Sequence, residues 1–194
     1  MMQNEDTIRS PRKTPKLLTM CFELAEVLCS AVFAIAVLFS FFARFAGVVG
    51  TSMVPTLQNS DWLAITATLP EPKRGEIVII SPRTNSFHEP LVKRVIAVAG
   101  DTIDILDGKV WVNGSVIAEP YLPGTSYTQR APDYSSSVEY PYSVPEGHVF
   151  VMGDNRGGST DSRFEDVGPI LVDDLLGRVL CRVFPNFTFG FPVD

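Results

Sequence analysis

The chain has 194 residues, of which 45% are hydrophobic, so it is long and apolar enough to fold around one core and is not a disordered protein. It carries 16 Lys and Arg residues against 22 Asp and Glu residues, a formal net charge of -6. Because the basic residues are scattered and form no stripe, we expect no nucleic acid partner.

The cysteines and histidines show no pattern typical of a disulfide framework or a metal site. Cys21, Cys29 and Cys181 form no CxxC pair, and Cys181 stands alone near the C-terminus. His88 and His148 lie far apart in the sequence and lack ligand spacing. We therefore expect no metal, and no motif indicates a cofactor.

The chain opens with a polar segment that is followed by an apolar run. Residues 1–16 carry four basic and two acidic side chains, and residues 27–43 carry no charge. At about 1.5 Å per residue this run spans about 26 Å, close to the ~30 Å hydrocarbon core of a bilayer. We predict a single membrane-spanning helix.

The positive-inside rule places the basic N-terminus in the cytoplasm. The expected organisation is a cytoplasmic tail over residues 1–21, a transmembrane anchor over 22–46 and an extracytoplasmic domain over 47–194. A cleaved secretory signal is the alternative. It fits less well, because the run is longer than a usual signal core and no small-x-small motif follows Ala43 or Ala46 closely.

Beyond Gly50 short runs rich in β-branched residues are separated by Pro, Gly, Asn and Asp, which is typical of strands and turns. The fold class is therefore mostly β. Asp107-Gly108 predicts a hairpin, because both residues tolerate the positive φ of a type I′ turn. Residues 123–145 show no sustained period and are predicted as a long excursion with room for one strand. The expected strands are residues 62–66, 76–81, 91–99, 102–106, 109–113, 148–152 and 177–184.

Ser52 lies in a Gly-rich, Pro-containing segment directly after the apolar run. A loop serine is usually structural, and its hydroxyl becomes a good nucleophile only beside a base, which is either His or a neutral Lys amine. The sequence offers His88, His148 and Lys93 as candidate bases.

Lys93 and Arg94 interrupt an otherwise apolar run, residues 91–99. Strand alternation sends their side chains to opposite faces, with Leu91, Lys93, Val95 and Ala97 on one and Val92, Arg94, Ile96 and Val98 on the other. Burial of Lys93 would disfavour its ammonium form, and lowering its pKa from about 10.4 toward about 7 to 8 requires roughly 3 to 4 kcal/mol. Such a lysine is a competent general base. A snorkelling or ion-paired structural lysine is the alternative.

Arg94, on the other face, is expected to pair with a carboxylate. The polar segment over residues 153–163 contains Asp154 and Asp161 and supplies candidates. By itself this segment is equally compatible with a solvated Gly-rich loop.

Three blocks occur in order along the chain: Ser-Met-Val-Pro-Thr-Leu at 52–57, Lys-Arg-Val at 93–95, and Gly-Asp-Asn-Arg at 153–156 with Ser-Thr-Asp-Ser-Arg at 159–163. With these blocks the chain resembles the type I signal peptidases over most of residues 45–182. The resemblance implies a mostly β catalytic domain at the outer membrane surface that removes signal peptides from exported preproteins after small residues. The expected partners are preprotein signal peptides, the lipid bilayer and a secretion channel.

The resemblance also implies the roles of individual residues. Ser52 would be the nucleophile, and Lys93 would take its proton and later deliver it to the leaving amine. Ser159 would hold the lysine amine in place, and Asp161 and Arg163 would support the loop.

Two positions depart from the family pattern. Some relatives use a Ser hydroxyl two residues before the nucleophile as an oxyanion donor, and here that position is Gly50. Besides the Ser52 amide, the second donor would then be a backbone group or absent. Gly157 and Gly158 replace the Asp or Asn that many relatives carry after the arginine.

Two rival interpretations remain open at the level of sequence. A non-catalytic β module tethered outside the membrane would make Ser52 and Lys93 structural. A different serine protease chemistry in the same fold would be self-cleavage by a Ser-Lys pair, as in repressor-type autoproteases, or a triad that uses His88. The anchor and the location disfavour the repressor type.

Overall fold

The structure, a computed structural model, describes residues 16–42, 44–66, 71–82, 89–131 and 136–191. The chain divides into two compact units, Met1–Ser40 and Phe41–Asp194. The tail over residues 1–15 and His88 lie outside the described residues.

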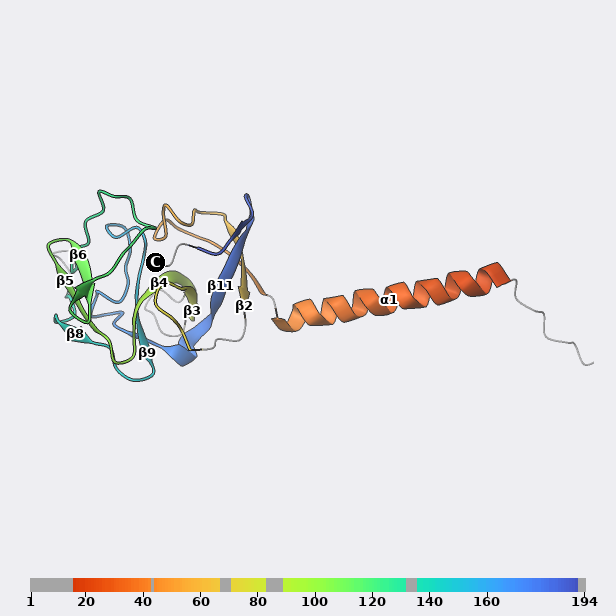
Figure 1. Ribbon diagram of the computed structural model, residues 1–194, viewed down its shortest axis with the longest axis horizontal. Helices are drawn as coiled ribbons and strands as arrows, with labels where there is room; N and C mark the ends of the chain where they lie inside the picture. Colours follow the sequence, from red (N-terminus) through yellow and green to blue (C-terminus); the bar gives the residue numbers. More distant parts are fainter. Residues whose placement is uncertain (1–15, 43, 67–70, 83–88, 132–135, 192–194) are drawn as a thin grey trace, which may run out of the picture. The chain divides into compact units, whose positions relative to one another are not determined.

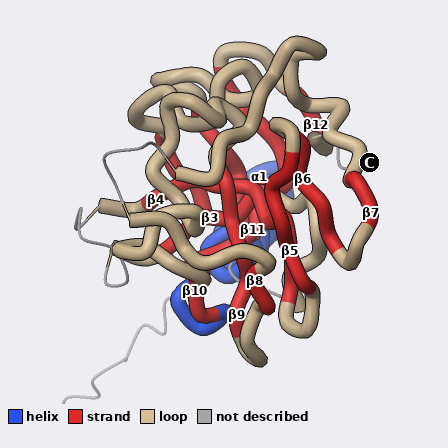
Figure 2. Tube along the Cα trace, turned by 90° about the vertical axis from the view of Figure 1, so that its left-hand side faces the viewer, coloured by secondary structure: helices blue, strands red, loops and turns tan. Residues whose placement is uncertain are grey.

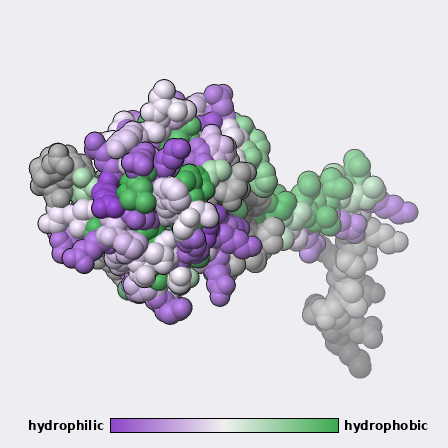
Figure 3. Space-filling model, turned by 60° about the vertical axis from the view of Figure 1, so that its left-hand side comes forward, coloured by the Kyte–Doolittle hydropathy of each residue, from purple (hydrophilic) through white to green (hydrophobic). Residues whose placement is uncertain are grey.

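The first unit is built on one long apolar helix, α1 (Lys16–Phe42). Its 27 residues extend about 40 Å, and its segment Lys16–Val37 is long and apolar enough to cross a membrane. Figure 3 shows apolar side chains along the helix, in contrast to the mixed surface of the second unit. The helix starts at Lys16, whereas the predicted anchor starts at residue 22. The earlier start arises because Leu17, Leu18 and Met20 favour helix and no Pro or Gly interrupts this turn.

The helix also ends earlier than the predicted anchor does, at Phe42 and not at residue 46. Arg44–Gly47 forms strand β1, which pairs antiparallel with β2 (Trp62–Thr66). The hydrogen bonds that β1 forms with β2 explain why the apolar run changes from helix to strand at this point.

The second unit is mostly β, as predicted, and contains two antiparallel sheets. The larger has the order β1-β2-β11-β3-β4-β9-β10, with β12 paired to β11, and the smaller has the order β7-β6-β5-β8. The remaining bounds are β3 (Ile77–Ile80), β4 (Leu91–Val98), β5 (Thr102–Leu106), β6 (Lys109–Val112), β7 (Ser115–Val116), β8 (Tyr142–Ser143), β9 (His148–Met152), β10 (Ile170–Leu171), β11 (Leu175–Phe184) and β12 (Thr188–Phe189), with a 3-10 turn at Val172–Asp174.

The β5–β6 hairpin lies on one side of this unit and the β2–β11 pair on the other, with β3, β4 and β9 between them (Figure 1). Figure 2 shows the strands at the centre of the unit and the longer loops gathered toward one end. The predicted type I′ hairpin is confirmed, because Leu106 pairs with Lys109 and both Asp107 (φ 51) and Gly108 (φ 75) are left-handed. The excursion over residues 123–145 holds the short strand β8.

Three clusters of buried apolar side chains form the core. One packs the small sheet against Phe150 and Met152, a second lies around β2, β3 and β11, and a third lies over β3, β4, β9 and β10. The second cluster includes Val48, Met53 and Leu57, so the segment after β1 is fixed to the core by three apolar side chains.

The predicted alternation of β4 holds for its first part and then fails. Leu91 and Val95 pack in the third cluster, as expected for one face. A bulge between Val95 and Ala97 shifts the pairing with β9. As a result Ile96 and Ala97 both pack in the first cluster, and Val98 packs in the third cluster with Leu91 and Val95. The prediction for Ala97 and Val98 was wrong, because a bulge adds one residue and reverses the faces that follow.

Candidate active site

Ser52 lies in a short loop that the core holds from both sides. The side chain of Met53 is buried and that of Leu57 is fully buried, and the Leu57 amide donates to the Met53 carbonyl at 2.9 Å. The Val54 amide donates to the Thr51 carbonyl at 3.1 Å, which closes a tight turn around Ser52. Ser52 itself is half-buried, so its hydroxyl is on a rigid loop yet accessible.

The loop after β9 closes on Ser52 at Gly153. The Asn155 amide donates to the Ser52 carbonyl at 2.9 Å. A Cβ at position 153 would lie 2.4 Å from the Ser52 carbonyl oxygen and 2.3 Å from Ser159 Oγ. Only glycine therefore lets the backbone of this loop approach both serines so closely.

Lys93 lies close to this same glycine. Its neighbour Arg94 pairs with Met152, the residue before Gly153, in the antiparallel register of β4 and β9. The Asp161 carboxylate, which accepts a hydrogen bond from the Gly153 amide, also acts electrostatically on Lys93. The three sequence blocks, separated by tens of residues, thus meet at Gly153.

The environment of Lys93 matches the predicted burial. The residue is 2% exposed, and desolvation lowers its pKa from 10.5 to about 8, with the Asp161 carboxylate opposing this shift and the Arg163 guanidinium adding to it. A snorkelling lysine is excluded by this burial. Among the ion pairs formed by the described residues, none includes Lys93.

Arg94 pairs with Asp154, as the sequence suggested. Arg94 Nε and Nη2 donate to the two oxygens of Asp154 at 2.9 and 2.7 Å, and Nη1 donates to the Gly75 carbonyl at 2.8 Å. The Thr56 hydroxyl donates to Asp154 Oδ2 at 2.6 Å. This chain of bonds joins the serine loop, the lysine strand and the loop after β9 at one carboxylate.

Asp161 and Arg163 hold the loop after β9 from inside. The Asp161 carboxylate accepts a bond from the Gly153 amide at 2.9 Å and two from the Arg163 guanidinium at 2.7 and 2.9 Å. Arg163 Nη2 also donates to the carbonyls of Arg156 and Ser159, at 2.9 and 3.2 Å. Both side chains are buried, so this bracket fixes the loop that carries Ser159.

Ser159 is buried, and its Oγ has no hydrogen-bond partner among the described residues. Since a buried hydroxyl without a partner is costly, this atom requires an explanation. It lies beside Gly153, which follows Met152, the β9 partner of Arg94.

Gly50 and the glycine pair after Arg156 take different places. The Gly50 amide donates to Asn59 Oδ1 at 3.1 Å, and its φ of 94° lies in the left-handed region, so this glycine shapes the turn before Ser52. A Cβ at Gly158 would lie 2.6 Å from the side-chain amide nitrogen of Asn155, Nδ2, whereas a Cβ at Gly157 would meet nothing within 4 Å.

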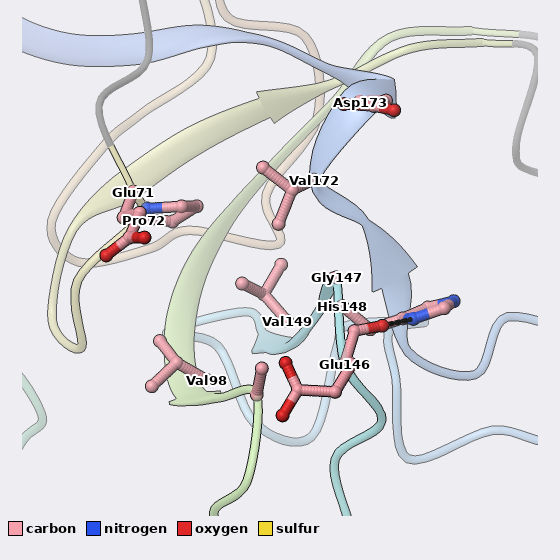
Figure 4. A pocket seen from close by; sticks show the side chains of 10 residues that line it. Glu71, Pro72, Val98, Glu146, Gly147, His148, Val149, Val172 and Asp173 are labelled. Carbon is pink, nitrogen blue, oxygen red and sulfur yellow. Dashed lines mark hydrogen bonds between the residues drawn. The ribbon is translucent and has the colours of Figure 1, made fainter.

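His148 is distant from Ser52. It begins β9, four residues before Met152 and hence about 13 Å along the strand from the end that meets the serine. Its ring bonds the Glu146 carbonyl at 2.9 Å and lines a cavity of about 460 Å³ among Val98, Val149 and Val172 (Figure 4). The structure therefore excludes His148 as the base for Ser52. No group of His, Cys, Asp and Glu within the described ranges is arranged to hold a metal.

A second polar network was not predicted from the sequence. Arg156 Nε donates to the Gly153 carbonyl at 3.1 Å, and its other nitrogens bind Glu119 and Thr128. The Tyr121 hydroxyl donates to the Glu119 carboxylate at 2.9 Å. The Arg94 guanidinium lies over the Tyr121 ring, with its Cζ 3.7 Å from the ring centroid. The motif that contains Arg156 was a signal, but nothing local marked Glu119 or Tyr121.

A half-exposed serine near a buried lysine in a β domain is typical of the serine peptidases in which lysine replaces histidine. Comparison with known proteins identifies the family. The family described as signal peptidase, peptidase S26, matches residues 21–184, and the chain belongs to this family of serine endopeptidases.

Curated relatives are similar over most of the chain. Signal peptidase I T of Bacillus subtilis (strain 168) is 39% identical over 140 residues, which cover 70% of this chain and 71% of the relative. Signal peptidase I of Bacillus licheniformis is 38% identical over 146 residues, 73% of this chain and 77% of the relative. A crystal structure of a signal peptidase I from Enterococcus faecalis is 28% identical and covers 57% of this chain and 98% of its own, with a TM-score of 0.45 that is too low to support a structural comparison.

Proposed function

We propose that this chain removes N-terminal signal peptides from exported preproteins, cutting after small residues, with Ser52 as the nucleophile and Lys93 as the general base. The observation that supports the proposal is the close approach of the Ser52 loop and Ser159 at Gly153, the residue after Met152, which pairs with Arg94 next to Lys93. The lowered pKa of Lys93, about 8, gives the amine a substantial neutral fraction near neutral pH.

The proposed reaction starts with a neutral Lys93 amine. It takes the proton of Ser52 Oγ as this oxygen attacks the carbonyl carbon after the small residue. The Ser52 amide stabilises the oxyanion that forms. The Lys93 ammonium then gives its proton to the leaving amine of the mature chain, and the same lysine activates the water that releases the signal peptide from Ser52.

Ser159 completes the dyad in this proposal. Its buried Oγ, which lacks a partner among the described residues, accepts a hydrogen bond from the Lys93 amine and points it at Ser52. Asp161 and Arg163 act by position, because they hold the backbone at Gly153 and Ser159. The amide of Gly50 is bound to Asn59, so its part is to shape the loop.

The proposed setting is the membrane surface. Helix α1 would cross the bilayer with the basic residues before it in the cytoplasm and the β unit outside, where preproteins emerge from a secretion channel. A non-catalytic tethered module would not account for a buried lysine that forms no ion pair among the described residues, since such a group costs stability and gives nothing structural in return.

The test is cleavage of a preprotein by the full chain in detergent. We expect Ser52→Ala and Lys93→Ala to reduce the rate roughly 10⁴-fold or more, while the exposed Ser115→Ala and Lys109→Ala, as matched controls, keep the wild-type rate. N-terminal sequencing of the product locates the cut. A wild-type rate in either dyad variant would refute the assignment. Activity that is kept in Lys93→Ala but lost in Ser52→Ala would favour a His88-based triad, which His88→Ala tests separately, and a wild-type chain that cuts no preprotein would favour a tethered module.

A further inference from the structure

A second cavity, of about 320 Å³, adjoins the Ser52 loop. Its walls come from the residues just after the serine, from residues 123–127 and from the loop after β9, and they include Val54, Pro55, Pro123, Tyr127, Asn155 and Gly157. We propose that this cavity is a substrate subsite that binds an uncharged side chain of the mature protein, within the first residues after the cut. This inference rests on the proposed function.

The cavity is close enough to the nucleophile to bind a neighbouring substrate residue. Asn155 lies in its wall, and the Asn155 backbone amide donates to the Ser52 carbonyl at 2.9 Å. The Asn155 side chain donates to the Thr51 carbonyl at 3.2 Å. A peptide whose carbonyl carbon is at Ser52 Oγ therefore has a side chain one or two residues away within reach of this wall, since a residue of extended chain spans about 3.3 Å.

The size of the cavity indicates on which side of the cut its occupant lies. The proposed function places a small residue directly before the cut. A cavity of about 320 Å³ is larger than a small side chain fills, so we assign it to a residue after the cut.

The charges in the wall are already paired, which determines the chemistry of the occupant. Asp154 is bound to Arg94 at both oxygens, and Arg156 is bound to Glu119 and Thr128. A charged substrate side chain would find no partner in these groups and would lose hydration. Val54, two prolines and the Tyr127 ring instead offer contacts to an uncharged side chain of medium size.

Gly157 leaves this cavity open. Its φ is outside the left-handed region, and a Cβ built on it meets nothing within 4 Å, so the backbone does not demand glycine there. A larger side chain at residue 157 would therefore occupy the cavity without straining the loop. Gly124 has the same properties and does not line this cavity, which makes it the matched control.

The experiment compares kcat/KM of the full chain on peptides that share one signal sequence and carry Ala, Leu, Asp or Lys at the first or second position after the cut. We expect the wild type to prefer Leu to Asp and Lys at one of these positions. Gly157→Leu should reduce the Leu-to-Ala selectivity there about tenfold to 100-fold, the range for filling an apolar pocket. Gly124→Leu should keep it.

A second pair of variants guards against misfolding. Tyr127→Ala removes one wall and should also reduce the selectivity, and Tyr127→Phe should restore it. Unchanged selectivity in both Gly157→Leu and Tyr127→Ala, or a change seen only when residues before the cut are varied, overturns the subsite while the proposed function stands. A wild-type chain that cuts no preprotein overturns both.

Discussion

Arg94 donates to both carboxylate oxygens of Asp154, at 2.9 and 2.7 Å, and neither side chain is exposed. Each partner adjoins a residue at the centre of the site, because Arg94 follows Lys93 and Asp154 follows Gly153. The pair therefore fixes the lysine strand and the loop after β9 at the point where they meet.

Removing one member of this pair should be strongly destabilising. We expect Asp154→Asn to lower the free energy of unfolding by about 3 to 5 kcal/mol, because it leaves the Arg94 guanidinium buried without its counter-charge. Urea denaturation measures the change. Asp104→Asn, which loses a pair with the half-exposed Arg130, should cost about 1 kcal/mol or less. Equal costs for the two variants would contradict this view of the buried pair.

The cleavage rate should depend on pH through Lys93. The general base must be neutral, so kcat/KM should rise with an apparent pKa of about 8 and level off above it. A peptide substrate that does not titrate between about pH 6 and 10 isolates the enzyme's own group. A rate that is flat across this range, or that falls with rising pH, would show that another group acts as the base.

The buried amine should also cost stability. The unfolded chain keeps the Lys93 proton up to about pH 10.5, whereas the folded chain releases it near pH 8, so the wild type gains stability as the pH rises between these values. Lys93→Met removes this penalty. We expect it to be more stable than the wild type at pH 7 by about 3 kcal/mol at most.

Thermal or urea unfolding of both proteins measures this difference across the pH range. The advantage of Lys93→Met should shrink as the pH rises from about 8 to 10.5, because the wild-type lysine becomes neutral in both states. A variant that is less stable than the wild type at pH 7 would mean that Lys93 has a structural partner in solution.

Gly153 should tolerate no side chain. A Cβ there would meet the Ser52 carbonyl oxygen at 2.4 Å and Ser159 Oγ at 2.3 Å, so Gly153→Ala must push the two serines apart. A displacement of about 1 Å at a reacting group can cost about 100-fold in rate, and we expect a loss in kcat of at least this size. Gly124→Ala, which meets nothing within 4 Å, is the control. Full activity of Gly153→Ala would show that the serines need not be this close.

Local patterns in the sequence predicted what local forces decide. Asp107-Gly108 predicted its hairpin because the positive φ is a property of those two residues. Lys93 and Arg94 were predicted on opposite faces because alternation needs no knowledge of the neighbours. Three very short strands, β7, β10 and β12, were missed, since two residues each carry too little pattern. Strand β1 was missed because its residues continue the apolar run.

What the sequence could not predict depends on distant partners. The bulge at Ile96 arises from the fit of β4 to β9. The Arg156–Glu119 bond joins residues 37 apart, and no spacing rule links them. The resemblance to a family suggested that Ser52, Lys93 and Ser159 act together, but their convergence on Gly153 is visible only in three dimensions.

The convergence on Gly153 also sets when the site can exist. Ser52 is synthesised first, and Lys93 follows it 41 residues later, but the strand and loop that bring them together end only at Arg163. Under the proposed mechanism, a chain that has been made only as far as Lys93 has its nucleophile and its base but not the loop that brings them together. We therefore expect activity only after the residues up to Arg163 have folded.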